Sequence, residues 1–232
     1  MKDEAHQNGK VYFVSGIDTD IGKTYATAIL ARSYMQAGKS VITQKMVQTG
    51  CSGMSDDILL HRQLMGIEPQ PVDVNGLTCP YVFNYPASPH LAAEMEGVEI
   101  HIELISSVTE TLLNKYDVVL LEGAGGLMAP VTRHILTIDY IAMFEMPVVL
   151  VTSGRLGSLN HTLLCLDACR SRNITVDTII YNGFPIEDEQ IQNDSYSFLE
   201  DYLGKHFPAT RLLLLPEVKP GEWFTFDLCA GC

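Results

Sequence analysis

One stretch near the N-terminus, residues 10–25, constrains the fold more than any other part of the chain. Residues 11–15 predict a buried strand, a turn rich in Gly and Asp follows, and Gly22-Lys23-Thr24 then opens a helix. In such a layout backbone N–H groups bind phosphate, the lysine reaches the β- and γ-phosphates, and the threonine hydroxyl holds Mg²⁺. The stretch therefore predicts a phosphate-binding loop with Lys23 as its principal charged residue.

The spacing within this loop is unusual. The common motif has four residues between its first Gly and Gly-Lys-Thr, whereas Gly16 and Gly22 enclose five. A Gly-rich turn without a ligand is the alternative interpretation. It does not explain why the strand, Gly-Lys-Thr and the helix occur together in this order, so a variant phosphate-binding loop is favoured.

Length and charge limit the class of protein. The chain has 232 residues, 47% of them hydrophobic, and this predicts one α/β domain over residues 1–232, with 1–9 frayed and 219–232 an unassigned tail. A formal net charge of −13 argues against nucleic acid or an anionic membrane as partner. No signal pattern or spanning apolar run is evident, and the six Cys are scattered. We therefore expect a cytoplasmic protein with reduced thiols.

Strands and helices alternate along the chain, which predicts a doubly wound, mostly parallel sheet. Residues 68–80 show no periodicity and are expected to be loop. The expected strands are 11–15, 41–47, 117–121, 147–152, 175–181 and 211–215. The expected helices are 23–37, a short one after Ser55, one ending near 96, then 101–115, 159–172 and 187–203, the last closed by Gly204.

Charged residues follow two of the expected strands at the edge where α/β proteins bind ligands. Lys45 lies in an otherwise apolar strand, where a buried ammonium without a partner would be costly. It is either an edge-strand lysine reaching solvent or, as we favour, a lysine delivered to the ligand. Glu122 ends a continuous apolar strand and is either an acid-capped turn or, as we favour, a carboxylate that organises a metal ion.

At three further places in the sequence, more than one interpretation of the residues is possible. Asp56 and Asp57 follow the capping residue Ser55, and either complement the helix dipole or supply a carboxylate to Mg²⁺. Ser158 is expected to cap the helix 159–172 and leave N–H groups for an anion, while His161 is more often structural than a base. Asn182 either contacts a purine or forms an Asn-Gly turn with Gly183.

Taken together, these stretches closely resemble the dethiobiotin synthetase family over roughly residues 11–216. The family's variant loop, second-strand lysine, Ser-Pro-His segment, Glu-Gly-Ala-Gly-Gly turn, Leu-Gly-x-x-Asn-His segment and strand-ending Asn all occur in order. They are Gly16-Ile17-Asp18-Thr19-Asp20-Ile21-Gly22-Lys23-Thr24, Lys45 with Thr49-Gly50, Ser88-Pro89-His90, Glu122-Gly123-Ala124-Gly125-Gly126, Leu156-Gly157-Ser158-Leu159-Asn160-His161 and Asn182.

The resemblance implies an ATP- and Mg²⁺-dependent ligase of biotin biosynthesis. It would join CO₂ to 7,8-diaminononanoate as a carbamate, which ATP phosphorylates before the second amine closes the cyclic urea. The family is homodimeric, with the substrate site at the subunit interface. Catalysis would fall to Lys23, Lys45 and Thr19.

The resemblance also implies the remaining site residues. Thr24, Asp57 and Glu122 would hold Mg²⁺, and Asp57 is preferred to Asp56 because it aligns with the family's acid. Thr49 would bind the diamine together with Thr19, and the second subunit's Gly157, Ser158, Leu159 and Asn160 would receive its distal carboxylate. The nucleotide would contact Asp20, Ile21, Gly22, Lys23, Thr24, Tyr25, Asp57, Glu122, Gly123, Ala124, Gly125, Asn182, Gly183, Pro216 and Glu217.

Two other classes of protein share the expected fold. Partitioning and septum-site ATPases are dimerising switches, but their loop carries an early lysine, Lys-Gly-Gly-x-Gly-Lys-Thr, where this chain has Asp18 and no lysine. A non-catalytic regulatory module would have no need to retain Lys23, Lys45, Asp57 and Glu122 together. The sequence therefore favours the ligase.

Overall fold

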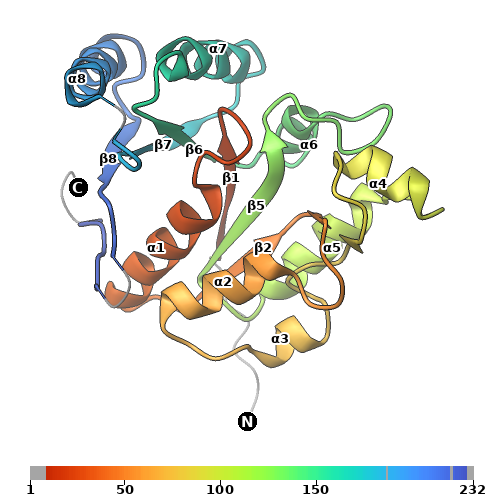
Figure 1. Cartoon of the computed structure of the whole chain (residues 1–232). Coiled ribbons are helices and arrows are strands. Elements are labelled where there is room, and N and C mark those ends of the chain that lie inside the picture. Colours follow the sequence, from red (N-terminus) through yellow and green to blue (C-terminus); the bar gives the residue numbers. More distant parts are fainter. Residues whose placement is uncertain (1–8, 187, 220–221, 229–232) are drawn as a thin grey trace.

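Six parallel strands form the central sheet of the computed structural model, which describes residues 9–186, 188–219 and 222–228 (Figure 1). Their order across the sheet is β2-β5-β1-β6-β7-β8, and β3 pairs separately with β4. The parallel sheet confirms the fold class expected from the alternation of elements. The strands are β1 (Lys10–Gly16), β2 (Val41–Lys45), β3 (Gln48–Thr49), β4 (Val82–Phe83), β5 (Val118–Gly126), β6 (Val148–Ser153), β7 (Val176–Asn182) and β8 (Arg211–Leu215).

Helices cover both faces of the sheet because successive side chains of each buried strand point to opposite faces. On β1, Tyr12 and Val14 pack towards α1, whereas Phe13 packs towards α5, α6 and α7. This double burial explains why the strands are apolar throughout. The helices are α1 (Lys23–Gln36), α2 (Asp56–Met65), α3 (Pro71–Val74), α4 (Pro89–Met95), α5 (Ile102–Leu113), α6 (Thr137–Met143), α7 (Ser158–Ser171) and α8 (Glu189–His206).

The structure corrects several expected boundaries. The segment expected to be loop contains the short helix α3, and α6 was not expected at all. β5 continues past Leu121 to Gly126, so Glu122 lies within the strand. α8 runs through Gly204 to His206, because Gly204 keeps helical geometry and the chain leaves the helix only at Phe207. A single Gly is therefore a weak stop signal when the apolar stripe continues beyond it.

The C-terminal segment 222–228 packs along α1, which assigns part of the tail that the sequence left open. Phe226 is buried, and its backbone N–H donates to Ser33 Oγ at 2.9 Å. Arg32 donates to the Phe224 carbonyl, and its guanidinium stacks 4.2 Å from the centre of the Trp223 ring. The tail thus covers the side of α1 that faces away from the sheet centre. Cys229 and Cys232 have the CxxC spacing of some redox or metal sites, although the sequence favours an ordinary tail, and they lie outside the described residues.

Phe226→Ala is expected to lower the free energy of unfolding by about 2 kcal/mol, because it removes a buried aromatic side chain. Urea denaturation followed by circular dichroism would measure the change. Phe198→Ala on α8 is the matched control, since that ring is 45% exposed. Equal stability of the Phe226 variant and the wild type would mean that the tail does not pack on α1 in solution.

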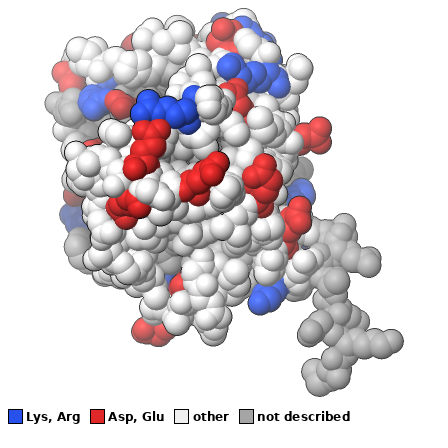
Figure 2. Space-filling view, turned by 90° about the vertical axis from the view of Figure 1, so that its right-hand side faces the viewer, with Lys and Arg blue, Asp and Glu red and all other residues white. Residues whose placement is uncertain are grey.

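Charged side chains of both signs are mixed on one face of the molecule. On the face seen in Figure 2, Lys and Arg side chains lie among Asp and Glu side chains and do not form a continuous basic area. Among the residues that the structure describes, no helix combines the length and apolar character needed to cross a bilayer.

Candidate active site

The loop between β1 and α1 adopts the geometry of an anion-binding turn. Asp20 and Gly22 both have positive φ, 55° and 92°. No side chain caps the first turn of α1, so its N–H groups are free to receive phosphate. A side chain at Gly22 would lie 2.5 Å from Asn182 Nδ2, which explains the glycine both by conformation and by space.

Lys23 lies folded against this loop. Its Nζ donates to the Asp18 carbonyl at 2.8 Å, and the side chain is 8% exposed. Burial lowers the pKa of Lys23, and the nearby Lys45 lowers it further, whereas Glu122 opposes the shift. The two ammonium groups are therefore close enough to influence one another. A phosphate oxygen could replace the Asp18 carbonyl as the partner of Lys23.

Lys45 points into the same site although β2 is an edge strand. Its Nζ lies 2.5 Å from Asp57 Oδ2 and 2.8 Å from Glu122 Oε1, and the residue is 5% exposed. Burial alone would depress the pKa of Lys45, but the carboxylates of Glu122 and Asp57 outweigh it and raise the pKa. The alternative of a lysine reaching solvent is thus excluded, and the ammonium stays charged at any ordinary pH.

Glu122 is the centre of the cluster and is fully buried. Its Oε1 faces Lys45 and Thr24, at 2.8 and 3.3 Å, and its Oε2 faces Thr27 and His61, at 2.7 and 2.9 Å. Burial would raise the pKa of Glu122, but the Lys45 charge and the His61 contact outweigh it, so the pKa is lowered. The carboxylate is therefore ionised and accepts four hydrogen-bonding contacts.

Three oxygen atoms converge where a cation could bind beside the nucleotide. Thr24 Oγ1 lies 3.2 Å from Asp57 Oδ1 and 3.3 Å from Glu122 Oε1. A hydroxyl and two carboxylates are hard donors, as Mg²⁺ requires when phosphate oxygens and water complete its shell. Within the described ranges, no three His, Cys, Asp or Glu side chains are grouped so as to hold a metal ion by themselves. The donor set fits a nucleotide-bound Mg²⁺.

Asp57 is the acid that turns towards the site, and Asp56 is exposed. Ser55 caps α2, because its side chain accepts the Ile58 N–H at 3.2 Å. Both acids also lie in the first helical turn, where they complement the dipole. Spacing alone left the choice between the two acids open and the family resemblance favoured Asp57; the capped helix turns Asp57 towards Lys45.

The N-terminus of α7 differs in detail from the expectation. Gly157 is the capping position, with φ of 92°, and Ser158 is the first helical residue. The Ser158 hydroxyl is 3.0 Å from Ser153 Oγ and caps nothing, so the expected Ser158 cap is wrong. No side chain caps the first turn of α7, although the Ser158 N–H already donates to the Arg155 carbonyl at 3.0 Å, so the remaining N–H groups there can donate to a carboxylate. His161 is exposed.

The residues predicted to bind the substrate are not all in contact with one another within a single chain. Arg155 links the loop before α7 to the phosphate loop through a 3.2 Å ion pair with Asp18. Across the part of the chain that the structure describes, no hydrogen bond or ion pair joins the residues 157–160 to Lys45 or Glu122. Thr19 is exposed on the phosphate loop and Thr49 is partly buried on β3. Because β1, β2, β5 and β6 run parallel, the loops that follow them nonetheless lie at the same edge of the sheet.

Asn182 contacts the phosphate-binding loop through a hydrogen bond. Its Nδ2 donates to the Ile21 carbonyl at 3.1 Å, and its Oδ1 accepts the Phe184 N–H at 3.2 Å. Gly183 pairs with Leu215 of β8, which leads to the exposed Glu217. A purine contact at Asn182 stays a prediction, as do the nucleotide contacts of Tyr25, Gly123, Ala124, Gly125, Gly183, Pro216 and Glu217.

Sequence reasoning missed two residues of the cluster, Thr27 and His61. Thr27 follows Lys23 by four residues on α1, and His61 follows Asp57 by four residues on α2. Residues four apart share a helix face. Extending each helix face from its proposed site residue would have identified both.

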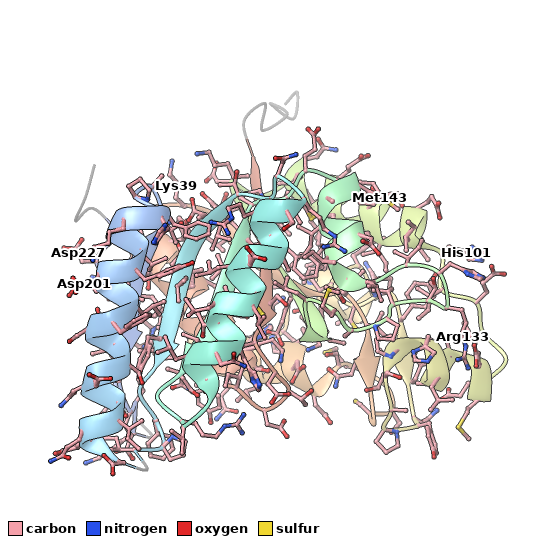
Figure 3. All side chains as sticks on the ribbon, turned by 90° about the horizontal axis from the view of Figure 1, so that it is seen from above. Lys39, His101, Arg133, Met143, Asp201 and Asp227 are labelled. Carbon is pink, nitrogen blue, oxygen red and sulfur yellow. The ribbon has the colours of Figure 1, made fainter. Side chains whose placement is uncertain are left out.

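A cavity of about 660 Å³ lies near α4, away from the cluster around Lys45 and Glu122. His101 and Arg133 line it at the end of the molecule opposite Asp201 of α8 (Figure 3). Arg133 is already paired with Glu94 at 2.5 Å. Size alone therefore does not mark the active site, which the converging charges identify instead.

Comparison with known proteins assigns the family. A family model described as an AAA domain matches residues 10–222. The ATP-dependent dethiobiotin synthetase BioD 2 of Haemophilus ducreyi is 54% identical over 89% of this chain and 98% of its own length. The chain belongs to the dethiobiotin synthetase family. The corresponding enzyme of Chlorobaculum tepidum is 52% identical over 81% of this chain and 79% of its own. Like its family, the chain is an ATP-dependent ligase.

Solved structures resemble it in fold alone. A ParA family ATPase from Chlorobium tepidum has a TM-score of 0.54 with 16% identity, covering 90% of this chain and 85% of that one. The pNOB8 ParA bound to nonspecific DNA has a TM-score of 0.52 with 15% identity, covering 91% and 89%. These similarities agree with a phosphate-binding-loop fold.

Proposed function

We propose that this ligase is Mg²⁺-dependent and converts 7,8-diaminononanoate and CO₂ into dethiobiotin through a phosphorylated carbamate. The observation that carries the proposal is the position of Lys45, held between Asp57 and Glu122 beside the phosphate loop. A nucleotide-binding protein with no acceptor to activate would have no need of a second buried ammonium there.

The chemistry requires cations because a carbamate oxygen attacks the γ-phosphoryl group and brings negative charges together. Positioning and charge neutralisation then provide most of the catalysis. Lys23 approaches the transferring phosphoryl group from the loop, and Lys45 approaches the carbamate from β2. Thr24, Asp57 and Glu122 would hold Mg²⁺, which supplies charge to the phosphate oxygens. After phosphorylation, the second amine attacks the carbamate carbon, and phosphate leaves as the urea ring closes.

The substrate site is proposed to need a second copy of the chain. The distal carboxylate of the diamine is assigned to the N-terminus of α7, residues 157–160, which no side chain caps, although the Ser158 N–H already donates to the Arg155 carbonyl at 3.0 Å. In one chain, no hydrogen bond or ion pair among the described residues joins this N-terminus to Lys45. A homodimer that brings the partner's α7 N-terminus over the Lys45 site would complete it. Thr19 and Thr49 would bind the diamine or its carbamate within the same chain.

ADP release that depends on both the diamine and bicarbonate is the expected result for the purified protein. The reason is that the phosphoryl acceptor forms only when both are present. A coupled assay for ADP, with dethiobiotin detected by mass spectrometry, measures it. Omitting either compound is the control. ADP release at the full rate without them would indicate a switch ATPase and overturn the proposal.

A further inference from the structure

His61 lies on α2, one turn after Asp57, and is fully buried against Glu122. Its Nε2 is 2.9 Å from Glu122 Oε2. An ionised carboxylate can only accept hydrogen bonds, so Nε2 is the donor in this contact. His61 therefore contacts the carboxylate from the side opposite to Lys45, and it does so from the helix that also carries Asp57.

The two oxygens of Glu122 are divided between two sets of partners. Oε2 is held by Thr27 and His61, whereas Oε1 is directed to Lys45 and Thr24. A half-turn of the carboxylate would only exchange two equivalent oxygens, so what these contacts fix is the plane and the position of the group. Thr27 anchors it from α1 and His61 from α2, so both helices that bear site residues fix the same group.

Core packing alone does not explain a histidine here. Among the described residues, His61 Nδ1 is buried without a hydrogen-bond partner. An unpaired buried polar atom is costly, and a leucine or methionine would fill similar space without that cost. Retention of the ring in spite of the unpaired Nδ1 indicates that the Nε2 contact offsets the penalty.

We propose that His61 is a positioning residue that anchors Glu122 Oε2 and thereby keeps Oε1 directed towards Lys45 and the nucleotide-bound cation. The inference rests on the proposed function because it assumes that Glu122 serves the cation. Outer partners that orient a metal-binding carboxylate typically change metal affinity or activity by roughly 10- to 100-fold when removed.

Three variants of His61 distinguish a role in positioning Glu122 from a role in core packing. In His61→Gln the amide nitrogen is as many bonds from Cβ as Nε2 is, so it can still reach Glu122. In His61→Asn the amide matches Nδ1 and cannot reach it, and His61→Leu has no donor. Thr109→Val, which removes a buried hydroxyl bonded to Gln44 at 2.8 Å, is the control for lost stability away from the site.

The test compares ADP affinity in EDTA with ADP affinity in Mn²⁺ by calorimetry. For wild type and Gln, Mn²⁺ is expected to tighten ADP binding equally, within about twofold. For His61→Asn and His61→Leu, the increase in ADP affinity caused by Mn²⁺ is expected to be roughly tenfold smaller, while the ADP affinity in EDTA is expected to stay unchanged. Folding of each variant is checked by thermal unfolding, and Thr109→Val is expected to retain the full gain.

The proposal would be overturned if folded His61→Leu or His61→Asn showed the same Mn²⁺-dependent increase in ADP affinity as the wild type. It would also be overturned if this increase were no larger for His61→Gln than for His61→Leu. This readout does not use turnover. If the wild type tightens with Mn²⁺ but never makes ADP with the diamine and bicarbonate, the proposed function fails while the positioning role of His61 stands.

Discussion

Replacing Lys45 with Gln is expected to reduce turnover by roughly two to three orders of magnitude, because loss of one preorganised charge contact typically costs about 3–4 kcal/mol of barrier. The substitution removes the only ammonium that contacts both Asp57 and Glu122 among the described residues. The affinity for ATP is expected to change less than turnover, since Lys23 and the loop N–H groups bind the phosphates. ADP release with diamine and bicarbonate measures the first quantity, and calorimetry measures the second.

The same substitution also bears on stability. Glu122 is fully buried, and removing one partner of a buried ion pair costs about 3–5 kcal/mol because the other charge is left uncompensated. Turnover must therefore be measured well below the unfolding temperature of the variant. Lys39→Gln is the matched control, because it removes an exposed lysine. Normal dethiobiotin formation by a folded Lys45→Gln protein would remove Lys45 from the mechanism.

How far the sequence predicts the site depends on which physical signal each residue leaves. Lys45 is conspicuous because a lysine within an apolar strand needs a buried partner. Its partner is less evident, since Asp56 and Asp57 are equivalent until the phase of α2 is known. His61 leaves no signal as an isolated residue, because its role comes only from the contact with Glu122 on β5. Candidate residues on strand ends can thus be found directly, whereas the residues that support them are found only by following a helix face from a candidate residue already identified.

The fold likewise has parts that the sequence predicts and parts that it does not. Apolar runs predict the six strands of the sheet, and their alternation with helices predicts parallel pairing. The missed elements, namely α3, α6 and the two-residue strands β3 and β4, are too short to give a periodic pattern. The N-termini of α3 and α6 are marked only locally, by Asp73 and Asp139, which accept the backbone N–H groups of Gln70 and Leu136. The tail gives only a weak pattern, because Phe224 and Phe226 are held by Arg32 and Ser33 of α1. Contacts between segments distant in sequence cannot be predicted from composition or spacing.

The position of α2 against β2 depends on a buried ion pair next to the site. Arg62 donates to Asp73 through Nε at 2.9 Å and through Nη2 at 2.7 Å, and its Nη1 donates to Thr43 Oγ1 at 2.7 Å. Arg62 follows His61 on α2, and Thr43 precedes Lys45 by two residues on β2. Arg62 thus connects α2, which bears Asp57, to α3 through Asp73 and to β2, which bears Lys45, through Thr43.

Asp73→Asn and Arg62→Met are each expected to lower the free energy of unfolding at pH 7 by about 3–5 kcal/mol, since each leaves one buried charge without its partner. Urea denaturation measures the change. The double variant Arg62→Met, Asp73→Asn is expected to lose less stability than the sum of the two single losses, because no charge remains buried. Strict additivity of the two losses would show that the groups do not interact.

Acid should reveal the same pair in the wild type. Burial would raise the pKa of Asp73, but hydrogen bonds from Arg62, the Gln70 N–H and Thr78 outweigh it and lower the pKa. A lowered folded-state pKa contributes stability that is present above the unfolded value, about 3.9, and is lost as pH falls through the folded value. The stability gap between the wild type and Asp73→Asn should therefore be constant near neutrality and narrow below about pH 4. A gap that stays the same down to pH 2 would mean that the pKa of Asp73 is the same in the folded and unfolded states, so that the contacts with Arg62, Gln70 and Thr78 do not lower it.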